Sequence, residues 1–164
     1  MNYIKLTLGI FTVLAASRFI PHPPNFTSLI ALSFYVPAIF GKRSILIVLF
    51  SFLITDLFIG FHNTLFFTWG SVLLISLLSR FFLGSFLSRV FGALCGAVIF
   101  FIITNFGVWF MGNYGFTTNG LITTYILAIP FFGNTFLSTI IYSLLIECLI
   151  KYKFFNNSYN LSLR

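Results

Sequence analysis

The chain has 164 residues, of which 59% are hydrophobic and only 7% are charged, whereas soluble domains carry roughly 25% charged residues. Because so few charges cannot cover a soluble surface, and because each membrane crossing takes roughly 20 apolar residues, the sequence predicts one integral membrane domain over residues 1–164, lying in a lipid bilayer. The net charge of +7 does not indicate a nucleic-acid partner, since the basic residues stand singly or in pairs between apolar segments, where they direct membrane topology.

The apolar segments predict an all-α fold with about six transmembrane helices. The first segment ends at Pro21, Pro23 and Pro24, which lack backbone donors and cannot continue a helix. The second contains Pro37 and is expected to be kinked or to end early. In chain order, the predicted helices cover residues 4–20, 26–40, 44–60, 64–80, 90–111 and 130–150, with a short helix at 121–128.

The last apolar stretch, from Gly120 to Ile150, is too long for one crossing. As a single helix it would measure about 46 Å, against a hydrocarbon core of roughly 30 Å. Pro130 is the expected break, because its ring clashes with the preceding turn, and Gly133 and Asn134 weaken the helix further. The sequence therefore predicts a short helix before Pro130 and a spanning helix after it.

Positively charged residues in short loops stay on the cytoplasmic side of a membrane. With six crossings, only Arg18 of the nine Lys and Arg residues falls on the opposite side. The others share the inner side: Lys5, Lys42, Arg43, Arg80, Arg89, Lys151, Lys153 and Arg164. The pattern predicts a multi-pass protein of the cytoplasmic (inner) membrane with both termini in the cytoplasm.

Polar side chains gather on the outer side and form the candidate site. An ionisable residue inside the membrane costs roughly 2.5–3.5 kcal/mol and normally has a partner, and Arg18 and Asp56 are the only opposite charges near the outer face. They form a structural ion pair, or Arg18 reaches the interface alone, or both belong to a ligand pocket. The candidate substrate-binding residues are Arg18, His22, Asn25, Asp56, His62, Asn63, Asn105 and Trp109.

Three aromatic and amide side chains have structural alternatives. Trp69 and Trp109 are more often interfacial anchors than rings that stack on a ligand. Asn105 brings two donors and an acceptor that need partners in hydrocarbon, and the backbone of a neighbouring helix can supply them.

Two further sequence patterns indicate contacts that stabilise the fold and not a binding site. Gly92 and Gly96 form a G-x-x-x-G step, which lets helices approach closely. Glu147 precedes Lys151 by four residues, the favourable order for an ion pair within one helix.

Neither a metal site nor an enzyme is predicted. His22, His62 and Asp56 could bind Ni, Co or Zn, but their spacing matches no recognised metal signature. The same three residues are the available proton carriers, and no nucleophile motif accompanies them. We therefore expect no catalytic residue, no metal ligand and no cofactor.

Four stretches of the chain combine rare polar residues with prolines or aromatics. They begin at Arg18 (R-F-I-P-H-P-P-N-F-T), Asp56 (D-L-F-I-G-F-H), Thr104 (T-N-F-G-V-W) and Ala128 (A-I-P-F-F-G-N-T). Through these motifs the chain resembles an uncharacterised family of small integral membrane proteins, and the resemblance carries no known function with it.

The order of parts, with six short helices, a proline-rich first outer loop and polar residues outside, resembles the S-component of energy-coupling factor (ECF) transporters. This resemblance implies a vitamin or micronutrient-like solute bound at the outer face, with a transmembrane T-component and two ATPases as partners. Two features depart from it. Thr12 and Ala16 only approximate the A-x-x-x-A step that docks on the T-component, and the start Met1-Asn2 lacks the Met-His signature of nickel and cobalt S-components.

The sequence thus leads us to expect a substrate-binding membrane subunit of a small-molecule uptake transporter. The alternative is a structural or assembly subunit of a larger membrane complex without its own ligand, in which the outer polar cluster ties its own loops together. A bound small molecule would favour the first function, and ligand-free co-purification with one stable complex would favour the second.

Overall fold

The computed structural model describes the backbone of residues 3–162 and the side chains of residues 4–152, so Lys153 and Arg164 of the predicted inner group lie outside the described side chains. Within this part the chain is all-helical, with six α-helices and no strand, which confirms the predicted all-α class. The helices are α1 (Tyr3–Phe19), α2 (Leu29–Phe40), α3 (Ile45–Ile59), α4 (Leu65–Leu78), α5 (Phe86–Phe110) and α6 (Thr118–Ser162), with 3-10 turns η1 (Lys42–Ser44) and η2 (Ser79–Phe82).

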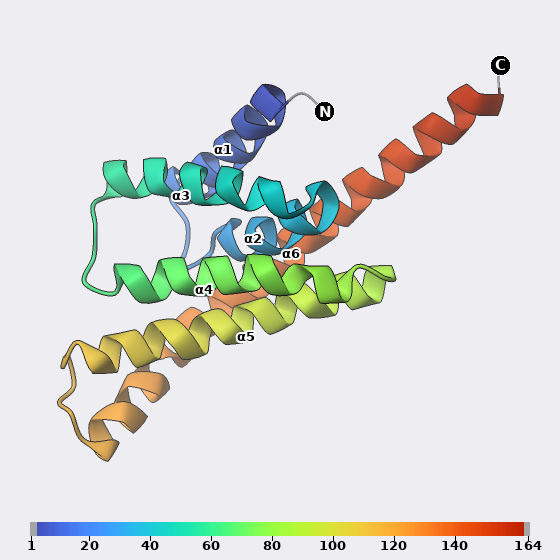
Figure 1. Cartoon of the computed structure of the whole chain (residues 1–164). Coiled ribbons are helices and arrows are strands. Elements are labelled where there is room, and N and C mark those ends of the chain that lie inside the picture. The colour runs from blue at the N-terminus through green and yellow to red at the C-terminus, as the bar shows by residue number, and fades with distance from the viewer. Residues whose placement is uncertain (1–2, 163–164) are drawn as a thin grey trace.

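The helices run back and forth along one direction, so that helix ends alternate between two ends of the bundle (Figure 1). In Figure 1, α3, α4 and α5 lie side by side, α6 runs along α5, and the C-terminal part of α6 extends past the other helices. One end of the bundle therefore gathers the segments that follow α1, α3 and α5.

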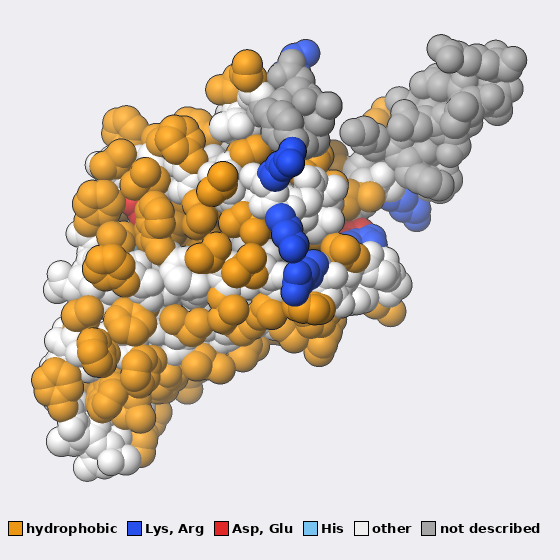
Figure 2. Space-filling view, viewed as in Figure 1, with side chains coloured by type: hydrophobic (Ala, Val, Ile, Leu, Met, Phe, Trp, Pro, Cys, Tyr) orange, Lys and Arg blue, Asp and Glu red, His pale blue; other side chains and the backbone are white. Residues whose placement is uncertain are grey.

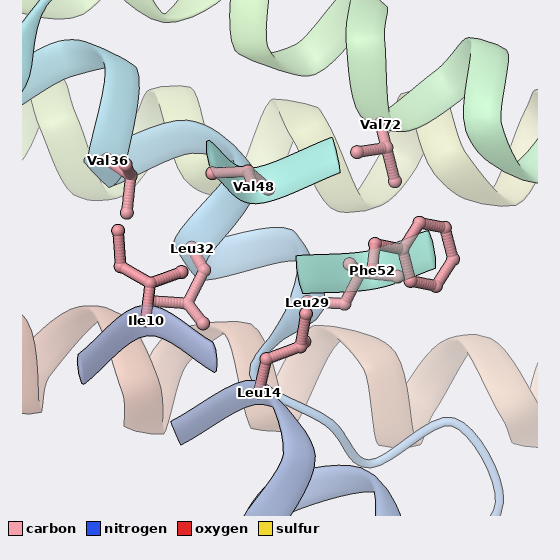
Figure 3. Close-up of a cluster of buried hydrophobic side chains, with 8 residues drawn as sticks. All are labelled: Ile10, Leu14, Leu29, Leu32, Val36, Val48, Phe52 and Val72. Atoms are coloured by element: carbon pink, nitrogen blue, oxygen red, sulfur yellow. The ribbon is translucent and has the colours of Figure 1, made fainter. Parts of the chain in front are cut away.

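The short helix α2 is the centre of the bundle. Its residues Leu29 to Pro37 are buried without interruption, and α2 contacts each of the other five helices. A helix that is apolar on all sides belongs in an interior. Figure 3 shows the cluster that joins it to α1, α3 and α4: Ile10, Leu14, Leu29, Leu32, Val36, Val48, Phe52 and Val72.

Three helical segments of the described chain are long and apolar enough to cross a membrane: Leu65–Phe82, Phe86–Phe110 and Thr118–Tyr152. The other three helices are shorter, with 17 residues in α1, 12 in α2 and 15 in α3. The bundle is consistent with a membrane protein.

The predicted break at Pro130 is wrong, because α6 continues as one helix from Thr118 to Ser162. A proline removes one helical hydrogen bond and crowds the preceding turn, but packing on both sides of Pro130 keeps this helix continuous. Before it, the Tyr125 hydroxyl donates to the Ile102 carbonyl of α5 (2.7 Å), and after it Thr135, Ser138 and Thr139 are buried in the bundle. Likewise, α2 continues past Pro37 to Phe40.

The start of α5 also differs from the prediction, because the helix begins at Phe86 and not at residue 90. Ser85 caps it by accepting a hydrogen bond from the Ser88 backbone N–H, which satisfies one of the unpaired donors of the first turn. Arg89 therefore lies inside the helix.

The predicted small-residue step packs as expected. A Cβ on Gly92 would lie 2.6–2.7 Å from the rings of Phe82 and Phe34, and one on Gly96 would lie 3.0 Å from Ile75. These glycines let α5 approach α2 and α4 closely.

Candidate functional site

The two ends of the bundle differ in charge. The end where α3 and α5 begin, called the basic end here, carries Lys5, Lys42, Arg43, Arg80, Arg89 and Lys151. On the face seen in Figure 2, Lys and Arg side chains gather toward this end, and none is visible at the opposite end. The opposite end, called the cavity end, holds Arg18, His22 and His62.

A cavity of about 430 Å³ opens between the helices at the cavity end. Its lining comes from α1, α2, α3, α4, α5, α6 and the loops between them. Among the predicted site residues, these line it: Arg18, His22, Asn25, His62 and Asn105. Sequence segments that are far apart in the chain thus meet in one place.

Arg18 and Asp56 form an ion pair, with 2.6 Å between guanidinium Nη1 and carboxylate Oδ1. The same nitrogen donates to the Thr55 hydroxyl, and the Trp69 indole N–H donates to the other carboxylate oxygen at 2.9 Å. Asp56 is buried behind the cavity wall, with its side chain 2% exposed, whereas Arg18 is 15% exposed and lines the cavity. Such charged and hydrogen-bonded partners offset the cost of burying a carboxylate.

Phe52 completes this cluster. The Arg18 guanidinium carbon lies 4.7 Å from the centre of the Phe52 ring, a cation–π contact. Trp69 stacks on the same ring, with 5.5 Å between centroids. Arg18, Phe52, Trp69 and Asp56 thus each contact two of the others and join α1, α3 and α4. These contacts fix the position of Arg18 at the cavity.

The proline-rich loop between α1 and α2 is held at both its base and its tip. The Ser17 and Ser28 hydroxyls lie 2.8 Å apart at the base, and the Asn134 side-chain amide of α6 donates to the Pro24 carbonyl at 3.0 Å. Asn25 adopts a left-handed backbone conformation, with φ at 63°, which asparagine tolerates better than most residues. The loop therefore brings His22 and Asn25 to the cavity in a fixed geometry.

The two histidines lie on opposite loops of the cavity end. His22 Nδ1 lies 2.7 Å from the Pro23 carbonyl, and His62 Nε2 lies 3.1 Å from the Thr68 hydroxyl. Among the described residues, no group of three or more His, Cys, Asp or Glu side chains comes together to hold a metal ion.

Asn105 belongs to α5, where its amide nitrogen donates to the Phe101 carbonyl at 2.8 Å. The sequence suggested a bond to the backbone of a neighbouring helix. The observed partner of the Asn105 amide nitrogen is instead the backbone of its own helix. Thr104 and Thr135 also line the cavity and bond to their own helices in the same way. Asn105 remains directed at the cavity as a lining residue.

Other predicted site residues lie outside the cavity lining. Asp56 does not contact the cavity, but it binds the guanidinium of Arg18, which does. Asn63 is exposed in the loop beside His62. The Trp109 indole N–H donates to the Thr117 carbonyl at 3.2 Å, so this ring closes the loop between α5 and α6.

Most of the aromatic and hydroxyl lining was not predicted from the sequence: Thr27, Phe52, Thr64, Thr68, Phe100, Phe101, Thr104, Phe131, Phe132 and Thr135. The Thr104 and Ala128 motifs contain several of these residues, and this was the available signal. With 25 Phe residues in the chain, however, no single ring stands out by type.

The basic end holds a second buried pair. The Arg89 guanidinium of α5 donates two hydrogen bonds, of 2.6 and 2.7 Å, to the Glu147 carboxylate of α6. Glu147 is 6% exposed, so the bidentate geometry keeps a buried charge satisfied. This contact joins two helices and was not foreseen from the sequence, and the pair with Lys151 on the same helix stays a prediction.

The fold and the site define a helical bundle with three membrane-capable segments, a basic end and a polar-aromatic cavity at the other end. The chain belongs to a family of unknown function (DUF6580), whose model matches residues 2–158. Membership of an uncharacterised family is therefore confirmed. No curated protein and no solved structure matches the chain.

Proposed function

We propose that this protein is the substrate-binding membrane subunit of an uptake transporter and captures a small molecule in the cavity lined by Arg18, His22 and Asn105. In this proposal the chain crosses the cytoplasmic membrane six times, with both termini inside and the cavity end outside. The observation that supports this proposal most strongly is that the cavity lies at the end of the bundle opposite the basic residues.

Charge supports this orientation. Lys and Arg in short loops remain on the cytoplasmic side, and Lys42, Arg43 and Arg80 lie in the turns of the basic end. The cavity end would then face outward and meet solutes before they cross the membrane.

The short helices are compatible with six crossings. The 12 residues of α2 span about 18 Å, less than the roughly 30 Å core. Because α2 is enclosed by other helices, it needs no full-length lipid-facing surface, and irregular backbone at membrane depth is tolerated where it lines a cavity.

The cavity has the dimensions and composition of a small-molecule site. Such sites measure roughly 300–1,000 Å³ and combine apolar and aromatic walls with a few polar groups. Here Phe100, Phe101 and Phe132 accompany Arg18 and Asn105 around about 430 Å³. Polar groups at membrane depth are costly, so their convergence favours a function in binding.

The likeness in architecture to ECF S-components supplies the transport step of the proposal. The chain would associate with a T-component and two ATPases, which provide the energy for release of the solute inside. Co-purification of such subunits from native membranes tests this part separately.

Native mass spectrometry of the full chain, extracted in mild detergent, tests the binding function. We expect a retained small molecule on the wild-type protein, and loss of it in Asn105→Ala, because Asn105 lines the cavity. Asn113→Ala, which changes an exposed loop residue, is the matched control and should retain the ligand. A ligand-free wild type, or equal retention in both variants, would contradict the proposed site.

A structural or assembly subunit is the second candidate. It is favoured by the internal bonding of the site, where Asp56 already neutralises Arg18 and Asn134 already ties down the proline-rich loop. In the same experiment, this function predicts a ligand-free chain that always carries one stable set of partner subunits.

A further inference from the structure

Two of the threonine hydroxyls that line the cavity donate their hydrogens to carbonyls of the protein. The Thr104 hydroxyl donates to the Phe100 carbonyl at 2.7 Å, and the Thr135 hydroxyl donates to the Phe131 carbonyl at 3.0 Å. A hydroxyl has one hydrogen and two lone pairs. Both threonines therefore offer acceptors to a bound molecule.

The two histidines also offer acceptors, because in each ring one nitrogen already donates a hydrogen bond to the protein. His22 Nδ1 faces the Pro23 carbonyl, which only accepts, so this nitrogen carries the hydrogen, and in the neutral ring Nε2 is an acceptor. The Thr68 hydroxyl donates to the Thr64 carbonyl at 3.2 Å, so His62 Nε2 must donate to Thr68. With the hydrogen on Nε2, the other ring nitrogen of His62, Nδ1, is left as an acceptor.

Asn105 adds a further acceptor. Its amide nitrogen donates to the Phe101 carbonyl, whereas its Oδ1 has no hydrogen-bond partner among the described residues. Lining residues on several helices therefore offer acceptors, and a ligand that supplies N–H or O–H donors satisfies them. Besides Arg18, the Asn25 amide and the Thr27 and Thr64 hydroxyls keep hydrogens for which the described residues provide no acceptor, so the ligand can also accept.

Charge disfavours ionic ligands of both signs. Among the described residues, no Asp or Glu lines the cavity, and Asp56 is buried behind Arg18, so the positive end of their ion pair faces the cavity. A cation would meet the guanidinium without a carboxylate. An anion would meet the lone pairs of the threonines, the histidines and Asn105, and the charge of Arg18 is already balanced by Asp56.

Aromatic rings form the rest of the wall. Phe101 and Phe132 lie 4.7 Å apart between centroids, and Phe52, Phe100 and Phe131 also line the cavity. Aromatic pairs prefer offset or edge-to-face arrangements at such distances, so these rings suit a flat ring system inserted among them.

We infer that the cavity selects an uncharged aromatic solute whose ring or substituents carry N–H or O–H donors. This inference rests on the proposed binding function and names the class of its substrate. Neutral amino- or carboxamide-substituted heteroaromatic molecules belong to this class, whereas carboxylates and ammonium compounds of the same shape do not.

Four indole derivatives with one shared ring test the inference by isothermal titration calorimetry on the full chain in nanodiscs. They are neutral indole-3-carboxamide, its fully N-methylated analogue without donors, anionic indole-3-carboxylate and cationic 3-(aminomethyl)indole. We expect the carboxamide to bind at least roughly tenfold more tightly than each other probe, the effect of about one well-made hydrogen bond.

Two isosteric variants locate the effect. Thr135→Val removes a lining hydroxyl and should weaken binding of the carboxamide. Thr139→Val removes a hydroxyl with the same bond one turn later on α6, outside the lining, and should leave binding unchanged.

The outcomes separate the substrate class from the function. If the carboxylate, the ammonium or the methylated probe binds as tightly as the carboxamide or more tightly, and Thr135→Val weakens that binding, the inferred class is wrong and the proposed binding site stands. If no probe binds at millimolar concentration while the wild-type protein retains a small molecule in native mass spectrometry, the inferred class is wrong and the proposed function stands. If the wild-type protein also retains no small molecule, both are overturned.

Discussion

At the scale of single residues, the position of Arg18 depends on a carboxylate that the cavity does not contact. Asp56 receives the Arg18 guanidinium and the Trp69 indole N–H while its own side chain is almost fully buried. Removing one partner of a buried ion pair leaves an uncompensated charge, which costs more than the pair contributes.

Asp56→Ala should therefore destabilise the protein by about 3 kcal/mol, because Arg18 and Trp69 both lose their acceptor. Thermal unfolding in mild detergent measures the change as a lowered melting temperature. The double variant Arg18→Met with Asp56→Leu should recover most of the loss, since it removes both charges and fills the space with apolar groups. Equal loss in the single and double variants would contradict a paired-charge role.

The ion pair was one of the alternatives drawn from the sequence, because Arg18 and Asp56 are the only opposite charges expected near one end. The contact of Trp69 with Asp56 was not foreseen. It joins residues 13 positions apart on two helices, and its formation depends on how α3 and α4 pack, which no local spacing encodes.

At the scale of helices, the close approach of α5 to its neighbours depends on glycine. The rings of Phe82 and Phe34 occupy the space that a side chain on Gly92 would need. Interiors are densely packed, so added atoms force neighbouring side chains or backbone to shift.

Gly92→Ala should destabilise the fold by about 1–3 kcal/mol through overpacking. Gly133→Ala on α6 is the matched control, because a Cβ there meets nothing within 4 Å, and alanine in a helix interior is favoured over glycine by roughly 0.5–1 kcal/mol. Melting temperatures of the two variants should therefore move in opposite directions. A stabilised Gly92→Ala would show that α5 does not pack as closely as described.

Helix type was predictable from the sequence, whereas helix ends were less so. Composition and apolar segments gave the all-α class, and the glycine step pointed to close packing. The break expected at Pro130 did not occur, because packing along α6 outweighs the local cost of one proline. Arg89 was placed outside a helix, whereas the Ser85 cap starts α5 before it, and its bond to Glu147 satisfies the charge inside the bundle.

At the scale of the whole molecule, the protein is polarised between a basic end and a cavity end. Five of the eight predicted site residues line one cavity, since their segments follow or precede helices at the same end. The sequence could place residues at an end, but it could not show which ones face the cavity, because facing depends on the rotation of each packed helix.

The central claim is that the cavity end faces outward and the basic end faces the cytoplasm. Cysteine labelling in right-side-out membrane vesicles tests it most directly, after replacement of the free Cys95 and Cys148. Asn63→Cys reports on the exposed loop beside the cavity and Lys42→Cys on the exposed turn at the basic end. We predict that an impermeant maleimide labels Asn63→Cys directly and Lys42→Cys only after permeabilisation. Reversed labelling, or direct labelling of both variants, would contradict the claim.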